Sequence, residues 1–169
     1  MYIFQKELSH TREQLINEIS SLCYAEFNEQ VTKKEWSIAQ VCHHLVLSEL
    51  LFTKGLTIGL SKNENIPVNE KKIHTLKDRS FKVDAPEIVQ PELIKFELQQ
   101  ILELLNDSRK KLVNVLRSVH DSSIWAEKSA KHPVFKEVSL EQWIEIIFLH
   151  EQRHIQQIEE LKTKIYTAN

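Results

Sequence analysis

Apolar residues recur every three or four positions in four separate stretches of the chain, which is the spacing of an amphipathic helix. Serine or threonine followed three residues later by glutamine, the pattern of a helix capping box, occurs at Thr11, Ser37 and Ser139. Pro91 stands at the start of the third stretch and suits the first turn of a helix. The pattern predicts four helices, over residues 5–28, 37–59, 90–119 and 139–165.

Two longer polar segments separate these helices. Residues 61–90 and 121–138 contain proline and show no sustained period, so both are expected to be irregular connections. The chain has only 2 glycines in 169 residues, against an average near 7%, which argues against many tight turns and strands. These features predict an all-α four-helix bundle, mainly up-and-down, with long connections after the second and third helices, formed by a single domain over residues 1–169.

The charge balance excludes several classes of partner. There are 22 basic and 24 acidic residues, so no basic excess favours nucleic acid or an anionic membrane surface. The longest apolar runs are broken by charge well short of the ~20 residues of a membrane span. The N-terminus also turns charged before a signal-peptide core could form. A soluble, cytoplasmic protein is therefore expected.

Candidate chemistry is concentrated in the last predicted helix, which contains H-E-x-x-H, the motif of zinc-peptidase helices. His150 and His154 share the inward apolar stripe, where one metal ion would satisfy both rings, whereas two buried histidines would each need a polar partner. Glu159 and Glu160 lie too far along the same helix to reach back to such an ion. A third ligand has to come from upstream.

The second helix offers an upstream pair in C-H-H-L, His43 and His44. Helical periodicity barely separates them, because both border apolar faces. One histidine from the second helix could join two from the fourth if these helices are neighbours, which a bundle permits. Four other histidines fall at helix ends or in connections and are expected to be solvated: His10, His74, His120 and His132.

At this point the residues resemble a known family. W-S-I-A-Q-V-C-H-H-L-V-L-S-E, residues 36–49, is followed about a hundred residues later by H-E-Q-R-H-I-Q-Q-I. This combination is similar to the DinB/YfiT-like superfamily of bacterial four-helix proteins, and it covers two of the four helices directly. The resemblance implies three metal ligands at His44, His150 and His154, followed by Gln157 and Ile158. His43 is the alternative to His44.

Such a ligand set implies one divalent ion with an open coordination position. Zinc suits three imidazoles, and nickel, manganese or iron would also fit. The resemblance implies a metal-dependent thiol S-transferase, using a low-molecular-weight thiol such as bacillithiol, or a hydrolase, acting on a small electrophile. It also implies a homodimer. The alternative is a non-catalytic metal-binding or stress-response bundle.

Glu151 departs from the family pattern. It is a candidate general base if its side chain turns toward the metal, and a solvent-facing charge if it does not, because it lies 100° around the helix from His150. Glu49, Gln152 and Gln157 are candidate partners for the imidazole N–H groups of the ligands.

Overall fold

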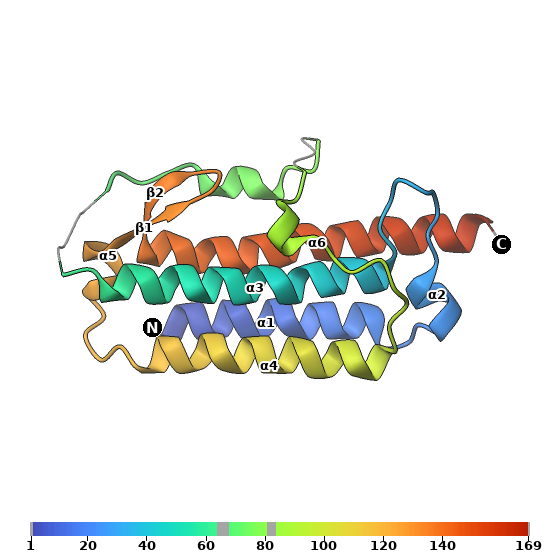
Figure 1. Ribbon diagram of the computed structural model, residues 1–169, viewed down its shortest axis with the longest axis horizontal. Coiled ribbons are helices and arrows are strands. Elements are labelled where there is room, and N and C mark those ends of the chain that lie inside the picture. The colour runs from blue at the N-terminus through green and yellow to red at the C-terminus, as the bar shows by residue number, and fades with distance from the viewer. Residues whose placement is uncertain (1, 64–67, 81–83, 169) are drawn as a thin grey trace.

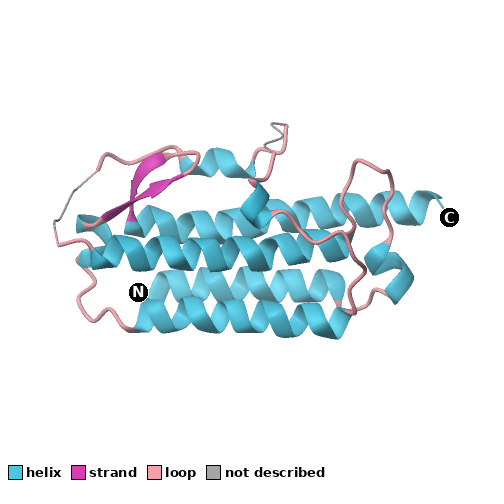
Figure 2. Ribbon diagram, viewed as in Figure 1, coloured by secondary structure: helices cyan, strands magenta, loops and turns pink. Residues whose placement is uncertain are grey.

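Four long helices make up most of the chain in the computed structural model, which describes residues 2–63, 68–80 and 84–168. They are α1 (Tyr2–Ile19), α3 (Ile38–Ser61), α4 (Leu98–Arg117) and α6 (Leu140–Ala168), packed side by side (Figure 1). Short elements occupy the connections (Figure 2): α2 (Tyr24–Asn28), the 3₁₀ turns η1 (Ile73–Lys77) and η2 (Glu87–Val89), α5 (Ile124–Glu127), β1 (Ser129–His132) and β2 (Lys136–Ser139). The predicted four-helix bundle is confirmed.

The order of helix directions differs from the expected up-and-down arrangement. In Figure 1, α1 and α6 run one way, and α3 and α4 run the other. Phe96, just before α4, exchanges two backbone hydrogen bonds with the side chain of Asn28, which lies near the start of α3. The connection from α3 to α4, of which residues 62–63, 68–80 and 84–97 are described, therefore has to return along the whole of α3, which is about 36 Å for 24 residues. A connection this long permits two consecutive helices to run in parallel.

Two expected helix-start signals, Thr11 and Pro91, do not begin a helix, and tertiary contacts involve residues at or beside both positions. The first helix begins at Tyr2, so Thr11 lies buried inside it and does not cap it. The third long helix, α4, begins at Leu98 and not at Pro91. The backbone on either side of Pro91 is instead bound to α3: the Val89 carbonyl contacts His44, and the Glu92 N–H donates to His43. The first helix also breaks after Ile19, and a separate turn, α2, follows.

The two serines that were predicted to cap helices, Ser37 and Ser139, form different hydrogen bonds. Ser37 forms a complete capping box, because its hydroxyl accepts from the Gln40 N–H and its own N–H donates to the Gln40 side chain. Ser139 accepts from the Gln142 N–H at 3.2 Å. The Gln142 side chain instead exchanges hydrogen bonds with the backbone of Lys71, which fastens the long connection to α6.

A small antiparallel hairpin occupies part of the connection that was expected to be irregular. Ala130 of β1 lies opposite Val138 of β2. His132 is buried here, which corrects its expected solvated position. Its Nδ1 accepts from the N–H groups of Val134 and Phe135, closing the turn. Burial lowers the pKa of His132 to about 4, so the ring is neutral at neutral pH.

The apolar core is divided into two clusters along the bundle axis. One contains Leu15, Leu45, Leu105 and Ile155, and the other contains Leu8, Phe52, Leu112 and Leu149. On every long helix a charged residue lies between the two clusters: Arg12, Glu49, Arg109 and Glu151. Within the described ranges, no helix is both long enough and apolar enough to cross a membrane.

The contact between α3 and α6 generates a prediction. A Cβ on Gly55 would lie 2.2 Å from Cζ2 of Trp143, whose Nε1–H donates to the Phe52 carbonyl at 2.9 Å and holds the ring in place. We expect Gly55→Ala to lower the free energy of unfolding by about 1–3 kcal/mol, despite a helix-propensity gain of about 1 kcal/mol. Urea unfolding followed by circular dichroism measures it. Thr57→Ala, at an exposed position of the same helix, is the control. A stabilised Gly55→Ala protein would contradict the close packing.

Candidate metal centre

Three imidazole rings converge between α3 and α6. His44 comes from α3, and His150 and His154 come from adjacent turns of α6. His150 Nε2 lies 3.4 Å from His44 Nε2 and 3.2 Å from His154 Nε2. A tetrahedral zinc ion bound at 2.0–2.1 Å separates its nitrogen ligands by about 3.3–3.4 Å. These two spacings fit one ion between the rings, and the candidate ligand atoms of all three residues lie within 4.8 Å of one another.

The opposite nitrogens of two rings have acceptors that fix their protons. His44 Nδ1 donates to the Val89 carbonyl at 2.7 Å, and His154 Nδ1 donates to Gln157 Oε1 at 2.8 Å. A neutral ring protonated on Nδ1 keeps the lone pair of Nε2 for a metal. Gln157 thus occupies the partner position expected from the sequence. Val89 was missed, because nothing in the local pattern of the long connection identifies which of its carbonyls reaches His44.

The site keeps its histidines neutral. Burial is the main cause that lowers the pKa of all three rings, and nearby histidine rings also lower it; the pKa of His154 is about 3. His44 and His154 are buried, and His150 is half-buried. Because metal binding competes with protonation, depressed pKa values leave the rings ready to act as ligands at neutral pH.

The two adjacent histidines of α3 have different roles. His43 does not join the cluster: its Nδ1 accepts from the Glu92 N–H at 3.2 Å, and its ring lies 4.7 Å from that of Phe96. The structure therefore places His44, and not His43, beside the α6 pair. Both histidines nevertheless bind the same part of the long connection, on either side of Pro91.

Two aromatic rings and one hydroxyl line the cluster. The ring of Trp36 lies 5.0 Å from that of His44, and the ring of Phe52 meets His150 edge-on at 5.4 Å. Ser48 Oγ lies 3.4 Å from His44 Nε2. None of the three was singled out from the sequence as a site residue. The available signal for Ser48 was its position one helical turn after His44.

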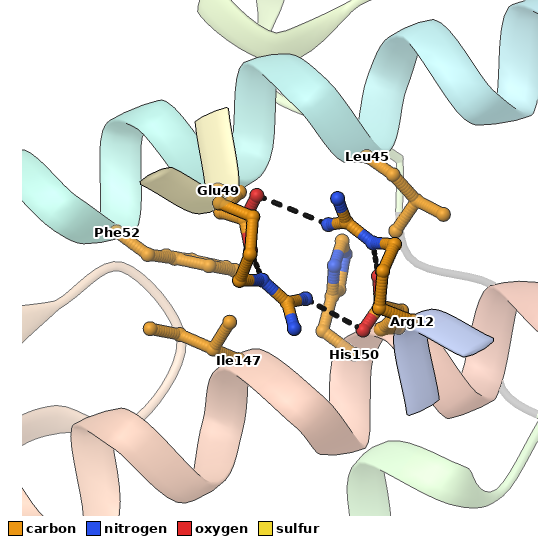
Figure 3. Close-up of a pocket in the computed structure, with 8 residues that line it drawn as sticks. Arg12, Leu45, Glu49, Phe52, Ile147 and His150 are labelled. Atoms are coloured by element: carbon orange, nitrogen blue, oxygen red, sulfur yellow. Dashed lines mark hydrogen bonds and ion pairs between the residues drawn. The ribbon is translucent and has the colours of Figure 1, made fainter. Parts of the chain in front are cut away.

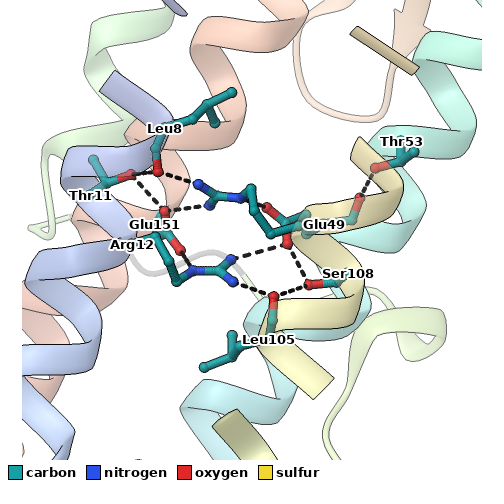
Figure 4. Close-up of polar contacts among 9 residues, drawn as sticks. Leu8, Thr11, Arg12, Glu49, Thr53, Leu105, Ser108 and Glu151 are labelled. Carbon is teal, nitrogen blue, oxygen red and sulfur yellow. Dashed lines mark hydrogen bonds and ion pairs between the residues drawn. The ribbon is translucent and has the colours of Figure 1, made fainter. Parts of the chain in front are cut away.

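Figure 4 shows a closed ring of four charges, and one cavity borders both this ring and His150. Glu49 accepts from Arg12 at 3.0 Å and from Arg109 at 2.6 Å, and Glu151 accepts from the same two arginines at 2.7 and 2.8 Å. Each of the four long helices contributes one member to this four-charge ring. This cavity of about 10 Å³, roughly the room for one water, is lined by all four ring residues and by Leu45, Phe52, Ile147 and His150 (Figure 3).

The carboxylate of Glu151 is committed to this ring. One oxygen accepts from Arg12 Nε, and the other accepts from Arg109 and from the Thr11 hydroxyl at 2.6 Å. Burial alone raises the pKa of Glu151, but the Arg12 and Arg109 guanidinium groups outweigh it and the net pKa is lowered. An ionised carboxylate saturated by three donors is a poor proton acceptor. We therefore assign Glu151 to the ring and not to a general-base role.

Among the described residues, no hydrogen bond joins the other two expected partners, Glu49 and Gln152, to an imidazole ring. Glu49 belongs to the four-charge ring, where the Ser108 hydroxyl also donates to it. Gln152 has a buried Oε1 with no hydrogen-bond partner in the part of the chain that is described. The sequence signal for the ring is a charge inside each apolar stripe, but which charges pair is decided by contacts between helices.

Comparison with known proteins gives a consistent family assignment. The family model of the DinB superfamily matches residues 7–158. The uncharacterized protein YuaE of Bacillus subtilis (strain 168) is 30% identical over 152 residues, which cover 90% of this chain and 93% of that protein.

Two solved structures share the fold at low sequence identity. TT2238, a four-helix bundle protein, has a TM-score of 0.64 and 16% identity, covering 93% of this chain and 96% of its own. YfiT from Bacillus subtilis, described as a probable metal-dependent hydrolase with an unusual four-helix bundle topology, has a TM-score of 0.65 and 17% identity, covering 96% and 86%. At these identities the likeness concerns the fold alone.

The four-charge ring generates a second prediction. Glu151→Gln removes one charge and leaves a guanidinium buried without its partner, so we expect the free energy of unfolding to fall by about 3–5 kcal/mol at pH 7. The folded pKa of Glu151 is lowered, so its contribution is present above the unfolded pKa and is lost as the pH falls through the folded value. The difference between wild type and Glu151→Gln should therefore shrink in acid.

Urea unfolding at pH 7 and at acidic pH measures this difference. Glu160→Gln is the matched control, because Glu160 lies on the same helix in an exposed ion pair with Arg79 and such pairs contribute little. Equal effects of the two substitutions would show that the ring does not stabilise the fold.

Proposed function

The chain belongs to the DinB superfamily, and on this premise we propose that it is a divalent-metal-dependent enzyme acting on a small electrophile, as a thiol S-transferase or a hydrolase. The observation that carries the proposal is a cluster of three neutral histidines that no carboxylate or thiol of the described residues joins. A structural site is closed by four protein ligands, whereas a catalytic site keeps a position open. Zinc is the proposed ion, because imidazole suits it.

A divalent ion held by three neutral imidazoles keeps its positive charge and lowers the pKa of a water or thiol that binds it. The protein's own part is to orient the ligands. Val89 and Gln157 accept from the Nδ1 atoms of His44 and His154, which fixes the rings with Nε2 toward a common point. Such outer partners also raise ligand basicity. Trp36 and Phe52 supply apolar surface beside that point, which suits the apolar part of a small electrophile.

The two reaction types have different support. The likeness to YfiT, itself described as a probable metal-dependent hydrolase, supports the hydrolase. Thiol transfer rests on the resemblance of the histidine motifs to family members that use low-molecular-weight thiols. Both reactions need an open coordination position, so the first test concerns the metal.

Protein prepared without a histidine tag should bind about one equivalent of divalent metal per chain, because the three rings form one site. We expect His150→Ala and His44→Ala to abolish stoichiometric binding, since each removes a ligand. His43→Ala should retain it, because His43 contacts Glu92 and not the cluster. Elemental analysis after dialysis measures all three. Full stoichiometry in His150→Ala would overturn the assignment of the site.

The activity is tested with a panel that pairs bacillithiol, mycothiol, glutathione or cysteine with monochlorobimane or fosfomycin, beside thiol-free hydrolysis assays. We expect turnover that is lost on chelation and in His154→Ala, because both remove the ion. Turnover without thiol would select the hydrolase. No turnover, together with a cobalt-substituted spectrum showing a fourth protein ligand, would instead support a non-catalytic metal-binding protein.

A further inference from the structure

The hydroxyl of Ser48 lies beside the metal-binding nitrogens and is almost completely buried, at 2% exposure. Its Oγ is 3.4 Å from His44 Nε2, the same distance that separates His44 Nε2 from His150 Nε2. Because His44 Nδ1 donates to a carbonyl, Nε2 carries the lone pair and Ser48 is the donor in this contact. The hydroxyl therefore points to the place where the three histidines converge.

Other hydroxyls on α3 behave differently. Thr53 donates to the Glu49 carbonyl at 2.7 Å and Thr57 donates to the Thr53 carbonyl at 3.0 Å, each four residues back along the helix. This is the usual arrangement of a hydroxyl inside a helix. Ser48 donates to the imidazole ring of His44 instead. Once the Nε2 lone pair is used by an ion, this buried hydroxyl needs another acceptor, because an unpaired buried donor is unfavourable.

We propose that Ser48 is an anion-binding residue of the site: its hydroxyl donates a hydrogen bond to the anionic atom of a small ligand, a thiolate in the transferase reaction, at the position left open by the three histidines. The inference rests on the proposed function, because it needs an open position. It adds a ligand contact that the three histidines do not provide. A hydrogen bond to an anion is stronger than one between neutral groups, so the contact contributes to ligand affinity.

The test uses the zinc-loaded protein with azide and 2-mercaptoethanol as probes, both titrated by calorimetry. Ser48→Ala removes only the hydroxyl, and we expect it to weaken azide binding about 10-fold or more. Its zinc affinity should stay at the wild-type level. Ser48→Thr keeps a hydroxyl and should bind azide nearly as well as wild type. Thr53→Val is the matched control, since it removes a buried hydroxyl of the same helix that faces a carbonyl.

The results that would overturn the role of Ser48 differ from those that would overturn the proposed function. Equal azide affinity in wild type and Ser48→Ala overturns the role of Ser48 and leaves the proposed function standing. Loss of zinc from Ser48→Ala also overturns it, because Ser48 would then be a ligand of the ion. If zinc-loaded wild type binds neither probe, the site is closed, and both the proposed function and the role of Ser48 fail. If Ser48→Ala does not fold, the test compares Ser48→Thr with Thr53→Val instead. Azide binding that is weakened in Thr53→Val and not in Ser48→Thr would contradict the proposal.

Discussion

Two glutamates and two arginines can be buried in a helical bundle only as a complete set, since removing any one leaves a charge without its partner. Here each member of the ring comes from a different long helix. The ring therefore forms only when the four helices are aligned along the bundle axis so that these four residues lie at the same level. The division of the core into two apolar clusters follows, because the ring occupies the level between them. His150 immediately precedes Glu151, so the position of α6 that completes the ring also sets the height of His150 and His154.

The candidate metal centre depends equally on the long connection between α3 and α4. Because these helices run in parallel, the connection must return along the bundle, and in doing so it brings the Val89 carbonyl to His44. The contact between His43 and Glu92 holds the same stretch a few residues further on. The orientation of His44 is thus determined by a segment with little regular structure, while His154 is oriented by Gln157 within α6.

The bundle is predictable from the sequence because helical period is a local property that four apolar stripes display clearly. The grouping of His44 with His150 and His154 follows from the motif and from the resemblance it supports. Non-local contacts account for what was missed. From the sequence, Thr11 has the pattern of a helix cap, but in the structure its hydroxyl donates a hydrogen bond to Glu151. Glu151 has the position of a general base, but Arg12 and Arg109 bind its carboxylate. His132 is buried by a hairpin that no pattern in the sequence indicated.

The pairing of α1 with α6 affects the order in which the chain can fold during synthesis. Arg12 and Glu151 are separated by 139 positions in a chain of 169 residues. Helical bundles usually fold rapidly because their contacts are local, and closing a loop of this length slows the search. While the ribosome is still making α6, α1 has neither its packing surface nor a carboxylate at position 151 for its arginine. The emerging protein therefore exposes an unfinished apolar core until its last long helix is available.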